Sequence, residues 1–428
     1  MTYQETLEYL YSQLPVYQHV GGSAYKEGLD NSLALDKYFD HPHKKYKTVH
    51  VGGTNGKGST SHLLAAILQQ AGHKVGLYTS PHLVDFRERI RVNGKKISEQ
   101  YVVDFVANHK KHFEPIHPSF FELTMMMSFC YFAEQEVDIA IIEVGLGGRL
   151  DSTNIITPEL SVITNISLDH TQYLGDTLEK IAYEKAGIIK PHIPVVIGEA
   201  EGEVRKIFES KAKSVDAPII FAEDENLIYA ADKLDNGSWL FQTNAYPNLK
   251  GELGGLPQIK NAATVLCAID ALRKRGIHTT MQSVYTGFSL VTEITGLMGR
   301  WQIIQQANPK IICDTGHNVG GIKYVSEQLL SEKYDRLHIV IGMVNDKDIS
   351  HVLALLPKEA TYYFTRATIS RALDEKELAD KGSAFDLQGN TFHTVKTAVE
   401  AAIANANADD LIFIGGSNFV VAEALECF

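Results

Sequence analysis

Residues 49–60 hold the groups best suited to chemistry: an apolar run leads into a glycine-rich turn, a lysine and two hydroxyls. The backbone N–H groups of such a turn and the positive end of the following helix form an anion cradle. Lys57 adds a point charge for the outer phosphates of a nucleotide. The spacing departs from the P-loop pattern G-x-x-x-x-G-K-[ST], because Val51 replaces its first glycine and Gly58 replaces the hydroxyl residue that holds Mg²⁺. The sequence therefore predicts a phosphate cradle whose magnesium ligands come from elsewhere in the chain.

Candidates for those ligands follow the apolar runs that we interpret as parallel strands, because ligands of open parallel sheets lie beyond the carboxyl ends of the strands. The runs lie at 48–51, 75–78, 137–144, 160–166, 194–197 and 218–221, with a second series at 311–313, 337–341, 361–364 and 411–414. A helix with one apolar face is expected after the loop and should stop at Gly72. The polar groups at the strand ends are residues 79–82, Glu143, Asp169, His170, Asp314 and residues 316–318.

Alternating strands and helices predict an α/β fold. We expect a P-loop-type nucleotide-binding domain with a mainly parallel sheet, followed by a smaller Rossmann-like domain. Residues 291–300 are interpreted as the linker, which places the domains at 1–296 and 297–428. A chain of 428 residues suits about two or three domains.

Composition and charge narrow the class of protein. The apolar fraction of 44% is ordinary for a globular chain, and the net charge of −12 argues against nucleic-acid and anionic-membrane partners. The four cysteines have no C-x-x-C spacing, which favours buried thiols over disulfides or zinc ligands. No run approaches the ~18 apolar residues of a membrane span, and the N-terminus lacks the pattern of a signal peptide. We expect a cytoplasmic monomer that acts on small molecules.

Nine separated motifs, in order along the chain, carry a resemblance to a known family. They are GTNGKGS at 53–59, YTSPH at 78–82, RERI at 87–90, EVGLGGRLDSTN at 143–154, LDHTQYLG at 168–175, EKAGIIK at 184–190, NAAT at 261–264, GRWQ at 299–302 and DTGHN at 314–318. The chain resembles the folylpolyglutamate synthase/dihydrofolate synthase family, a branch of the Mur-ligase superfamily of ATP-dependent amide-forming ligases. It departs from the family at 314–319, where D-x-A-H-N-P is usual, and at 256–260, where many relatives carry a histidine.

The resemblance implies that ATP is the nucleotide and that its β- and γ-phosphates bind Lys57 and the loop amides. The implied loop residues are Asn55, Gly56, Lys57, Gly58 and Ser59. It also implies Ser80, Glu143 and His170 as ligands of one or two Mg²⁺ ions. From its chemistry alone, His170 would be a hydrogen-bonded core histidine, whereas Glu143 ends a buried strand and needs a cation.

Further family positions concern the modification of a lysine and the far side of the nucleotide. Lys185 matches a lysine that many members carry as a CO₂-derived carbamate, which would give an oxygen ligand for a second Mg²⁺; an unmodified lysine paired with a phosphate is the alternative. Asn261, Arg300 and Asp314 match positions that contact ATP, so the resemblance places ATP in a cleft between the domains. For Arg300 alone, a surface salt bridge is the alternative.

Two segments match the pterin-binding parts of bifunctional relatives, with aromatic rings to sandwich a pterin and a carboxylate for its amino-pyrimidine edge. Their residues are Ser119, Phe120, Phe121, Glu122, Leu150, Asp151 and Ser152. Phe120 and Phe121 also fit the core face of one helix, which is the competing interpretation.

The resemblance places the glutamate site on the C-terminal domain. The implied residues are His317, Asn318, Ser417 and residues 370–372. Arg371 would pair bidentately with a glutamate carboxylate. Catalytic roles fall to Lys57, Lys185 and His317. By contrast, residues 41–45, with two histidines, are expected to form a solvated loop rather than a metal site.

The implied reaction adds L-glutamate to dihydropteroate, or to the glutamate tail of a reduced folate, through an acyl phosphate made from ATP. Residues 147–151 look like those of bifunctional relatives. One alternative is a Mur ligase that acts on a peptidoglycan precursor; the pterin segments and the stretch at 80–90 argue against it. The other is a nucleotide-gated binding protein without ligase activity, which the intact Lys57 and the three metal-ligand positions disfavour.

Overall fold

The computed structural model describes residues 1–14, 28–345 and 349–428. The first unit is built on eight strands: β1 (Lys47–Gly52), β2 (Val75–Tyr78), β3 (Ile90–Val92), β4 (Lys95–Lys96), β5 (Ile139–Glu143), β6 (Leu160–Ile163), β7 (Val195–Ile197) and β8 (Ile219–Phe221). Their order is β4-β3-β2-β5-β1-β6-β7-β8, and all pairs are parallel except those of β3 with β2 and β4. The phosphate loop therefore leaves an inner strand of a mainly parallel sheet.

Helices cover both faces of this sheet, because successive residues of a strand point to opposite sides. The helices are α1 (Tyr3–Gln13), α3 (Asp30–Tyr38), α4 (Lys57–Gln70), α5 (Glu99–Phe113), α6 (Phe120–Glu134), α7 (Thr171–Leu174), α8 (Leu178–Ala186), α9 (Gly202–Ser214), α10 (Gln258–Lys274), α11 (Met281–Ser289) and α12 (Val291–Thr295). Ile141 of β5 packs into a core with α4, α10 and α11, whereas its neighbour Ile142 packs into a core with α5 and α6.

A small antiparallel sheet lies between β8 and α10 in the chain. It consists of β9 (Ile228–Lys233), β10 (Trp239–Thr243) and β11 (Leu249–Gly251). Within the described residues, no helix is long and apolar enough to span a membrane.

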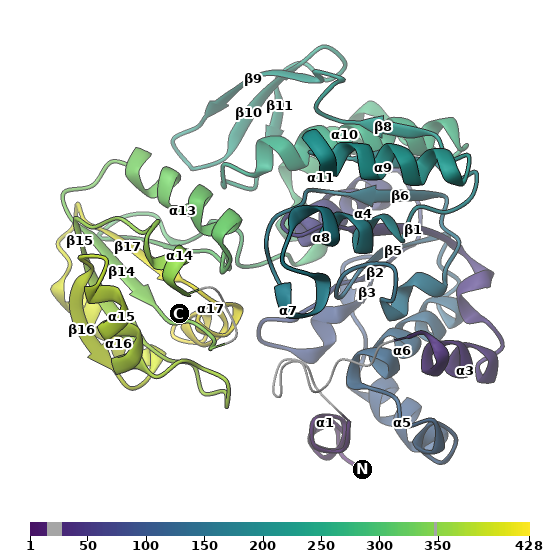
Figure 1. Cartoon of the computed structure of the whole chain (residues 1–428), viewed down its shortest axis with the longest axis horizontal. Coiled ribbons are helices and arrows are strands. Elements are labelled where there is room, and N and C mark those ends of the chain that lie inside the picture. Colours follow the sequence, from purple (N-terminus) through teal and green to yellow (C-terminus); the bar gives the residue numbers. More distant parts are fainter. Residues whose placement is uncertain (15–27, 346–348) are drawn as a thin grey trace.

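The second unit is a six-stranded sheet with the order β12-β13-β17-β14-β15-β16, parallel except at β12. Its strands are β12 (Gln302–Gln305), β13 (Lys310–Cys313), β14 (Leu337–Ile341), β15 (Ala360–Thr365), β16 (Gln388–Phe392) and β17 (Leu411–Gly415). Its helices are α13 (Val319–Ser331), α14 (Ile349–Leu353), α15 (Glu375–Ser383), α16 (Val395–Asn405) and α17 (Asn418–Leu425). Figure 1 shows the two units side by side, with β9–β11 at the top of the view. The predicted fold class is confirmed.

Each strand predicted from an apolar run is present, but the prediction at 160–166 is too long. The strand β6 ends at Ile163, because the next residues turn toward the phosphate loop: Thr164 N donates to Gly52 O at 3.0 Å and Thr54 N donates to Asn165 O at 2.9 Å. The domain boundary after residue 296 lies between β11 and β12 and stays a prediction; part of the expected linker forms α12.

The prediction of a solvated loop at 41–45 is wrong. Residues Pro42–Lys45 form a short 3₁₀ helix, and His43 is buried. The Nδ1 atoms of His41 and His43 lie 2.5 and 2.8 Å from the two carboxylate oxygens of Asp36, which is itself buried. Both histidines therefore satisfy one buried carboxylate of α3.

Candidate active site

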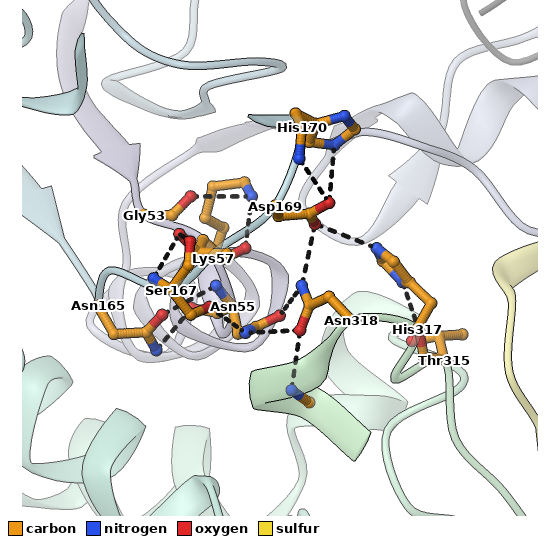
Figure 2. A network of polar contacts seen from close by, with 12 residues as sticks. Gly53, Asn55, Lys57, Asn165, Ser167, Asp169, His170, Thr315, His317 and Asn318 are labelled. Atoms are coloured by element: carbon orange, nitrogen blue, oxygen red, sulfur yellow. Dashed lines mark hydrogen bonds and ion pairs between the residues drawn. The ribbon is translucent and has the colours of Figure 1, made fainter. Parts of the chain in front are cut away.

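The phosphate loop between β1 and α4 is held by side chains that follow β6. Thr164 Oγ1 donates to Asn55 O at 2.6 Å. The Asn165 amide donates to Asn55 O at 3.1 Å and accepts from Asn55 N at 3.0 Å (Figure 2). The N–H of Asn55 was predicted to bind phosphate, but in this structure it already donates its hydrogen bond to Asn165. The N–H groups of Lys57, Gly58 and Ser59 in the first turn of α4 have no partner within the helix and suit an anion better.

Two glycines of the loop leave room for side chains from distant segments. Gly56 has a φ of 84°, and a Cβ there would stand 2.3 Å from Asn261 Oδ1 of α10. A Cβ on Gly58 would stand 3.3 Å from Arg300 Nη2. The glycine that replaces the Mg²⁺-binding hydroxyl of a P-loop therefore faces a guanidinium group.

The helix α10 contacts the loop through a residue that the sequence reasoning missed. Asn261 Nδ2 donates to Gln258 Oε1 at 3.0 Å, and Gln258 Nε2 donates to Ser59 Oγ at 3.2 Å. All three side chains are buried. Gln258 lies three residues before Asn261, on the same face of the helix, and this spacing is the signal that would have found it.

Arg300 and Asp314 meet at the start of the second unit. Arg300 Nη1 donates to Gly299 O at 3.2 Å and to the hydroxyl of Thr315. The Asp314 carboxylate accepts from Trp301 N and Gly316 N, each at 2.7 Å. Burial raises the pKa of Asp314, and the charge of Arg300 opposes that rise. Arg300 forms no salt bridge among the described residues, so the structure does not support the surface salt bridge offered as its alternative role.

A cavity of about 250 Å³ opens beside the loop. Lys57 reaches its wall, where Nζ donates to Gly53 O at 3.2 Å and to Thr54 O at 3.1 Å. The predicted site residues that line it are Lys57, Ser80, Ser119, Phe120, Phe121, Glu122, Leu150, Asp151, Ser152, His170, Lys185, His317, Arg371 and Ser417. The predicted residues outside this lining are Asn55, Gly56, Gly58, Ser59, Glu143, Asn261, Arg300 and Asp314. The cavity thus joins segments from both units.

Two of the predicted magnesium ligands meet at the ends of β2 and β5. Ser80 N donates to Glu143 Oε2 at 3.4 Å. Glu143 is 4% exposed, and burial raises its pKa to about 7 although several nearby cations oppose the rise. Within the described part of the chain, the bond from Ser80 N is the one hydrogen bond of the Glu143 carboxylate. A buried carboxylate with so few partners favours a cation beside it. His170 lines the cavity with Ser80, and the three-ligand set stays a prediction.

Asp169, a strand-end group without an assigned role, links both units. Its Oδ2 accepts from Asn318 Nδ2 at 2.9 Å and lies 3.5 Å from His317 Nε2 (Figure 2). Its Oδ1 accepts from the backbone N–H of His170 at 2.8 Å and lies 3.8 Å from the Nε2 atom of the same residue. The Asp169 carboxylate is thus placed between the predicted metal-binding histidine and the predicted catalytic histidine.

Lys185 of α8 is buried in the cavity wall at 4% exposure. Burial, together with the charge of Lys57, lowers the pKa of Lys185 to about 7. A substantial fraction of this amine is therefore neutral and nucleophilic at neutral pH.

The two aromatic residues of the predicted pterin segment have different environments. Phe121 lines the cavity and packs against Gly145, where a Cβ would stand 2.4 Å from its Cζ. Phe120 is 3% exposed and its ring stacks on Tyr11 at 5.4 Å between centroids. The helix-core interpretation therefore fits Phe120 better than Phe121.

The polar residues of these segments are anchored by helix caps. Ser119 Oγ accepts from Glu122 N at 3.2 Å, and Glu122 Oε2 accepts from Ser119 N at 2.6 Å, which is a capping box at the start of α6. Asp151 accepts from Leu146 N at 2.7 Å and from Thr153 N at 3.0 Å. Burial raises the pKa of Asp151. The protein thus fixes the orientation of these carboxylates at the cavity wall.

A buried cation on the same wall was not predicted. Arg89, from the RERI motif, is 3% exposed and its guanidinium carbon lies 5.2 Å from the centre of the Phe120 ring. Its Nε donates to His82 Nδ1 at 2.7 Å, and burial lowers its pKa.

The second unit provides the opposite wall. The Arg371 guanidinium lies 5.5 Å from the centre of the Phe419 ring, and Ser417 Oγ accepts from Val420 N at 3.1 Å as the N-cap of α17. Asn318, expected with the glutamate site, is not part of the cavity lining and bonds to Asn55 instead.

Comparison with known proteins identifies the family. Residues 51–269 match the family model for the Mur ligase middle domain, and residues 299–418 match that for the Mur ligase, glutamate ligase domain. The dihydrofolate synthase/folylpolyglutamate synthase of Bacillus subtilis (strain 168) is 34% identical over 375 residues, which cover 83% of this chain and 86% of that protein. The chain belongs to the dihydrofolate synthase/folylpolyglutamate synthase family of Mur ligases.

Solved structures of this family have the same fold. E. coli FolC in complex with DHPP and ADP gives a TM-score of 0.86 at 31% identity, covering 100% of this chain and 97% of that one. A bifunctional folylpolyglutamate synthase/dihydrofolate synthase with Mn, AMPPNP and L-glutamate bound gives 0.82 at 29% identity, covering 100% and 98%. The predicted family and the class of ATP-dependent ligase are confirmed, and the peptidoglycan alternative is not supported.

Proposed function

We propose that the protein joins L-glutamate to dihydropteroate, and to the glutamate tail of reduced folates, at the expense of ATP. The observation that carries this proposal is the single cavity lined by Lys57 of the phosphate loop, Phe121 of the pterin segment and Arg371 of the second unit. A three-substrate reaction needs such a convergence of walls. Because one chain supplies the phosphate loop, the pterin segment and the wall of the second unit, we also propose that a monomer is sufficient for activity.

The acceptor carboxylate is a poor electrophile and must be activated first. Its oxygen attacks the γ-phosphorus of ATP, and the bond between that phosphorus and the β,γ-bridging oxygen breaks. ADP departs, and the acceptor becomes an acyl phosphate. The α-amine of glutamate then attacks the acyl carbon, phosphate departs with the acceptor oxygen, and the amine loses a proton. Lys57 and the first-turn amides of α4 stabilise the charge of the phosphoryl transfer, which needs positioning rather than a protein nucleophile.

The polar groups around Glu143 suit Mg²⁺, because a buried carboxylate and the hydroxyl of Ser80 are hard oxygen donors. We assign the ion to these residues and His170, and the Mn bound in the related structure supports a divalent cation in such a site. When bound, Mg²⁺ would neutralise charge on the β- and γ-phosphates.

We assign a carbamate to Lys185. The neutral Nζ attacks the carbon of CO₂ and loses a proton, which gives an N-carboxylate in place of the ammonium. Burial in the cavity wall and a pKa of about 7 both support this step. Protein prepared in ¹³C-bicarbonate should show a carbamate carbon resonance that Lys185→Gln lacks; equal spectra would favour the unmodified lysine.

The function is tested by the incorporation of labelled L-glutamate with ATP and one acceptor at a time. Dihydropteroate and tetrahydrofolate should each yield a labelled amide product. If neither is extended while a UDP-muramoyl substrate is, the proposed acceptors are wrong.

A further inference from the structure

A pair of side-chain amides joins the two units at the phosphate loop. Asn55 Nδ2 donates to Asn318 Oδ1 at 3.1 Å, and Asn318 Nδ2 donates back to Asn55 Oδ1 at 3.0 Å (Figure 2). The residues are 263 positions apart: Asn55 precedes α4, and Asn318 is the N-cap of α13. Asn318 is 4% exposed, so the pair lies inside the junction rather than on its rim.

The Asn318 amide makes two bonds at each of its polar atoms. Its Oδ1 also accepts from Gly321 N at 2.8 Å, which caps α13, and its Nδ2 also donates to Asp169 Oδ2 at 2.9 Å. The same Asp169 oxygen lies 3.5 Å from Nε2 of the neighbouring His317. One side chain thus caps a helix, contacts the phosphate loop and shares a carboxylate with the cavity histidine.

The other end of α13 is also bound to residues outside the second unit. Gln328 is 1% exposed, donates to Gly254 O at 2.9 Å and accepts from Leu256 N at 2.6 Å. The helix therefore spans the junction, with Gln328 held by backbone groups and the Asn55–Asn318 pair holding the end beside the phosphate loop.

We infer that Asn318 is a positioning residue, which holds the amino-acid wall of the cavity in a fixed position relative to the phosphate loop. A nucleotide that orders the loop restrains the Asn55 side chain, which restrains Asn318 and with it His317. The affinity for the amino acid is thereby coupled to occupancy of the loop, and the coupling is reciprocal. This inference rests on the proposed function and adds to it a residue that binds no substrate itself.

The substitution Asn318→Ser separates the helix cap from the bridge. Serine is as good an N-cap as asparagine, but its hydroxyl is too short to reach Asn55 or Asp169. We expect an unchanged affinity for AMPPNP measured without glutamate, and a KM for glutamate raised at least about tenfold, because two hydrogen bonds to Asn55 and one to Asp169 are lost. The gain in glutamate affinity that AMPPNP gives the wild type should disappear. A wild-type glutamate KM with the gain intact overturns the inference.

Two further variants separate positioning from a structural role. Asn318→Asp keeps the cap and the side-chain length but loses both donated bonds and faces Asp169, so its glutamate KM should rise at least as much; it also serves if the serine variant is unstable. Asn55→Ser combined with Asn318→Ser should raise the glutamate KM no further than Asn55→Ser alone. Additive increases would show that the two amides act separately.

Hydrogen exchange tests the coupling between the phosphate loop and Asn318 independently of the proposed function. In the wild type, AMPPNP should slow amide exchange at residues 317–321, and in Asn318→Ser it should not. If the wild type joins no glutamate, the proposed function fails and the exchange result alone decides the coupling. Equal protection in both proteins overturns the role of Asn318.

Discussion

Replacing Gly145 by alanine should move one wall of the cavity without altering its chemical groups. A Cβ on Gly145 would stand 2.4 Å from Phe121 Cζ, 2.6 Å from Phe121 Cε2 and 3.1 Å from Asp151 Oδ2, whereas ordinary contact begins at 3.4 Å. The ring must therefore shift by about 1 Å, and the free space beside it is the cavity. Gly145 is not among the glycines with a positive φ, so the backbone itself accepts alanine.

Gly145→Ala should lower the binding affinity for the pterin acceptor. A well-placed aromatic contact contributes about 0.5–1.5 kcal/mol beyond the burial of area, and a shift of 0.5–1 Å forfeits a large part of the dispersion energy. We expect the affinity for dihydropteroate to fall by about 1.4 kcal/mol, or roughly tenfold. The affinity for AMPPNP should not change, because Lys57 and the first turn of α4 keep their contacts.

Calorimetric titration with dihydropteroate, and separately with AMPPNP, measures the two affinities. Gly255→Ala is the matched control, because a Cβ there meets only ordinary contacts, the nearest at 3.5 Å. If Gly145→Ala keeps its thermal midpoint and binds dihydropteroate as tightly as the wild type, Phe121 does not form the acceptor wall.

Three other substitutions test the fold and the loop. Burial lowers the pKa of His50 to about 3, so the neutral ring contributes its full share to the free energy of unfolding above pH 6.5. This contribution declines by up to about 4–5 kcal/mol as the pH falls toward 3. Urea unfolding of His50→Gln between pH 7.5 and 4 should show a shallower decline, and a slope equal to that of the wild type would refute this. Gln328→Ala should lower the unfolding free energy by about 1–3 kcal/mol, because the buried carbonyl of Gly254 and the part-buried N–H of Leu256 lose their partner. A loss below about 0.5 kcal/mol would contradict this. Lys57→Ala should lower kcat about 10²- to 10³-fold with little change in thermal midpoint, and full turnover would remove Lys57 from the mechanism.

Much of the fold was predictable because buried parallel strands are continuous apolar runs. The strands β5 and β14 are buried along their whole length and were recognised. The strand β16 is exposed along most of its length at the edge of its sheet, so it carries no such run and was missed. The strands β3, β4 and β11 have two or three residues each, too few for a periodic signal.

The site was predictable as a set of residues but not as a set of contacts. The order of motifs identified the family, and many of the implied residues line one cavity. The Asn55–Asn318 pair and the position of Arg300 beside Gly58 depend on how the two units dock, which the spacing of residues along the chain does not encode. The capping box of Ser119 was available as a local S-x-x-E pattern and was overlooked in favour of a ligand-binding role.

Transfer of ¹⁸O from the acceptor carboxylate to phosphate tests the central claim, that ATP activates this carboxylate as an acyl phosphate. Dihydropteroate labelled with ¹⁸O in both carboxylate oxygens is incubated with the enzyme, ATP, Mg²⁺ and L-glutamate, and the released phosphate is analysed by mass spectrometry. We predict one ¹⁸O atom in each phosphate released, because the oxygen that attacks the γ-phosphorus leaves with it. Formation of the amide with unlabelled phosphate would contradict the mechanism.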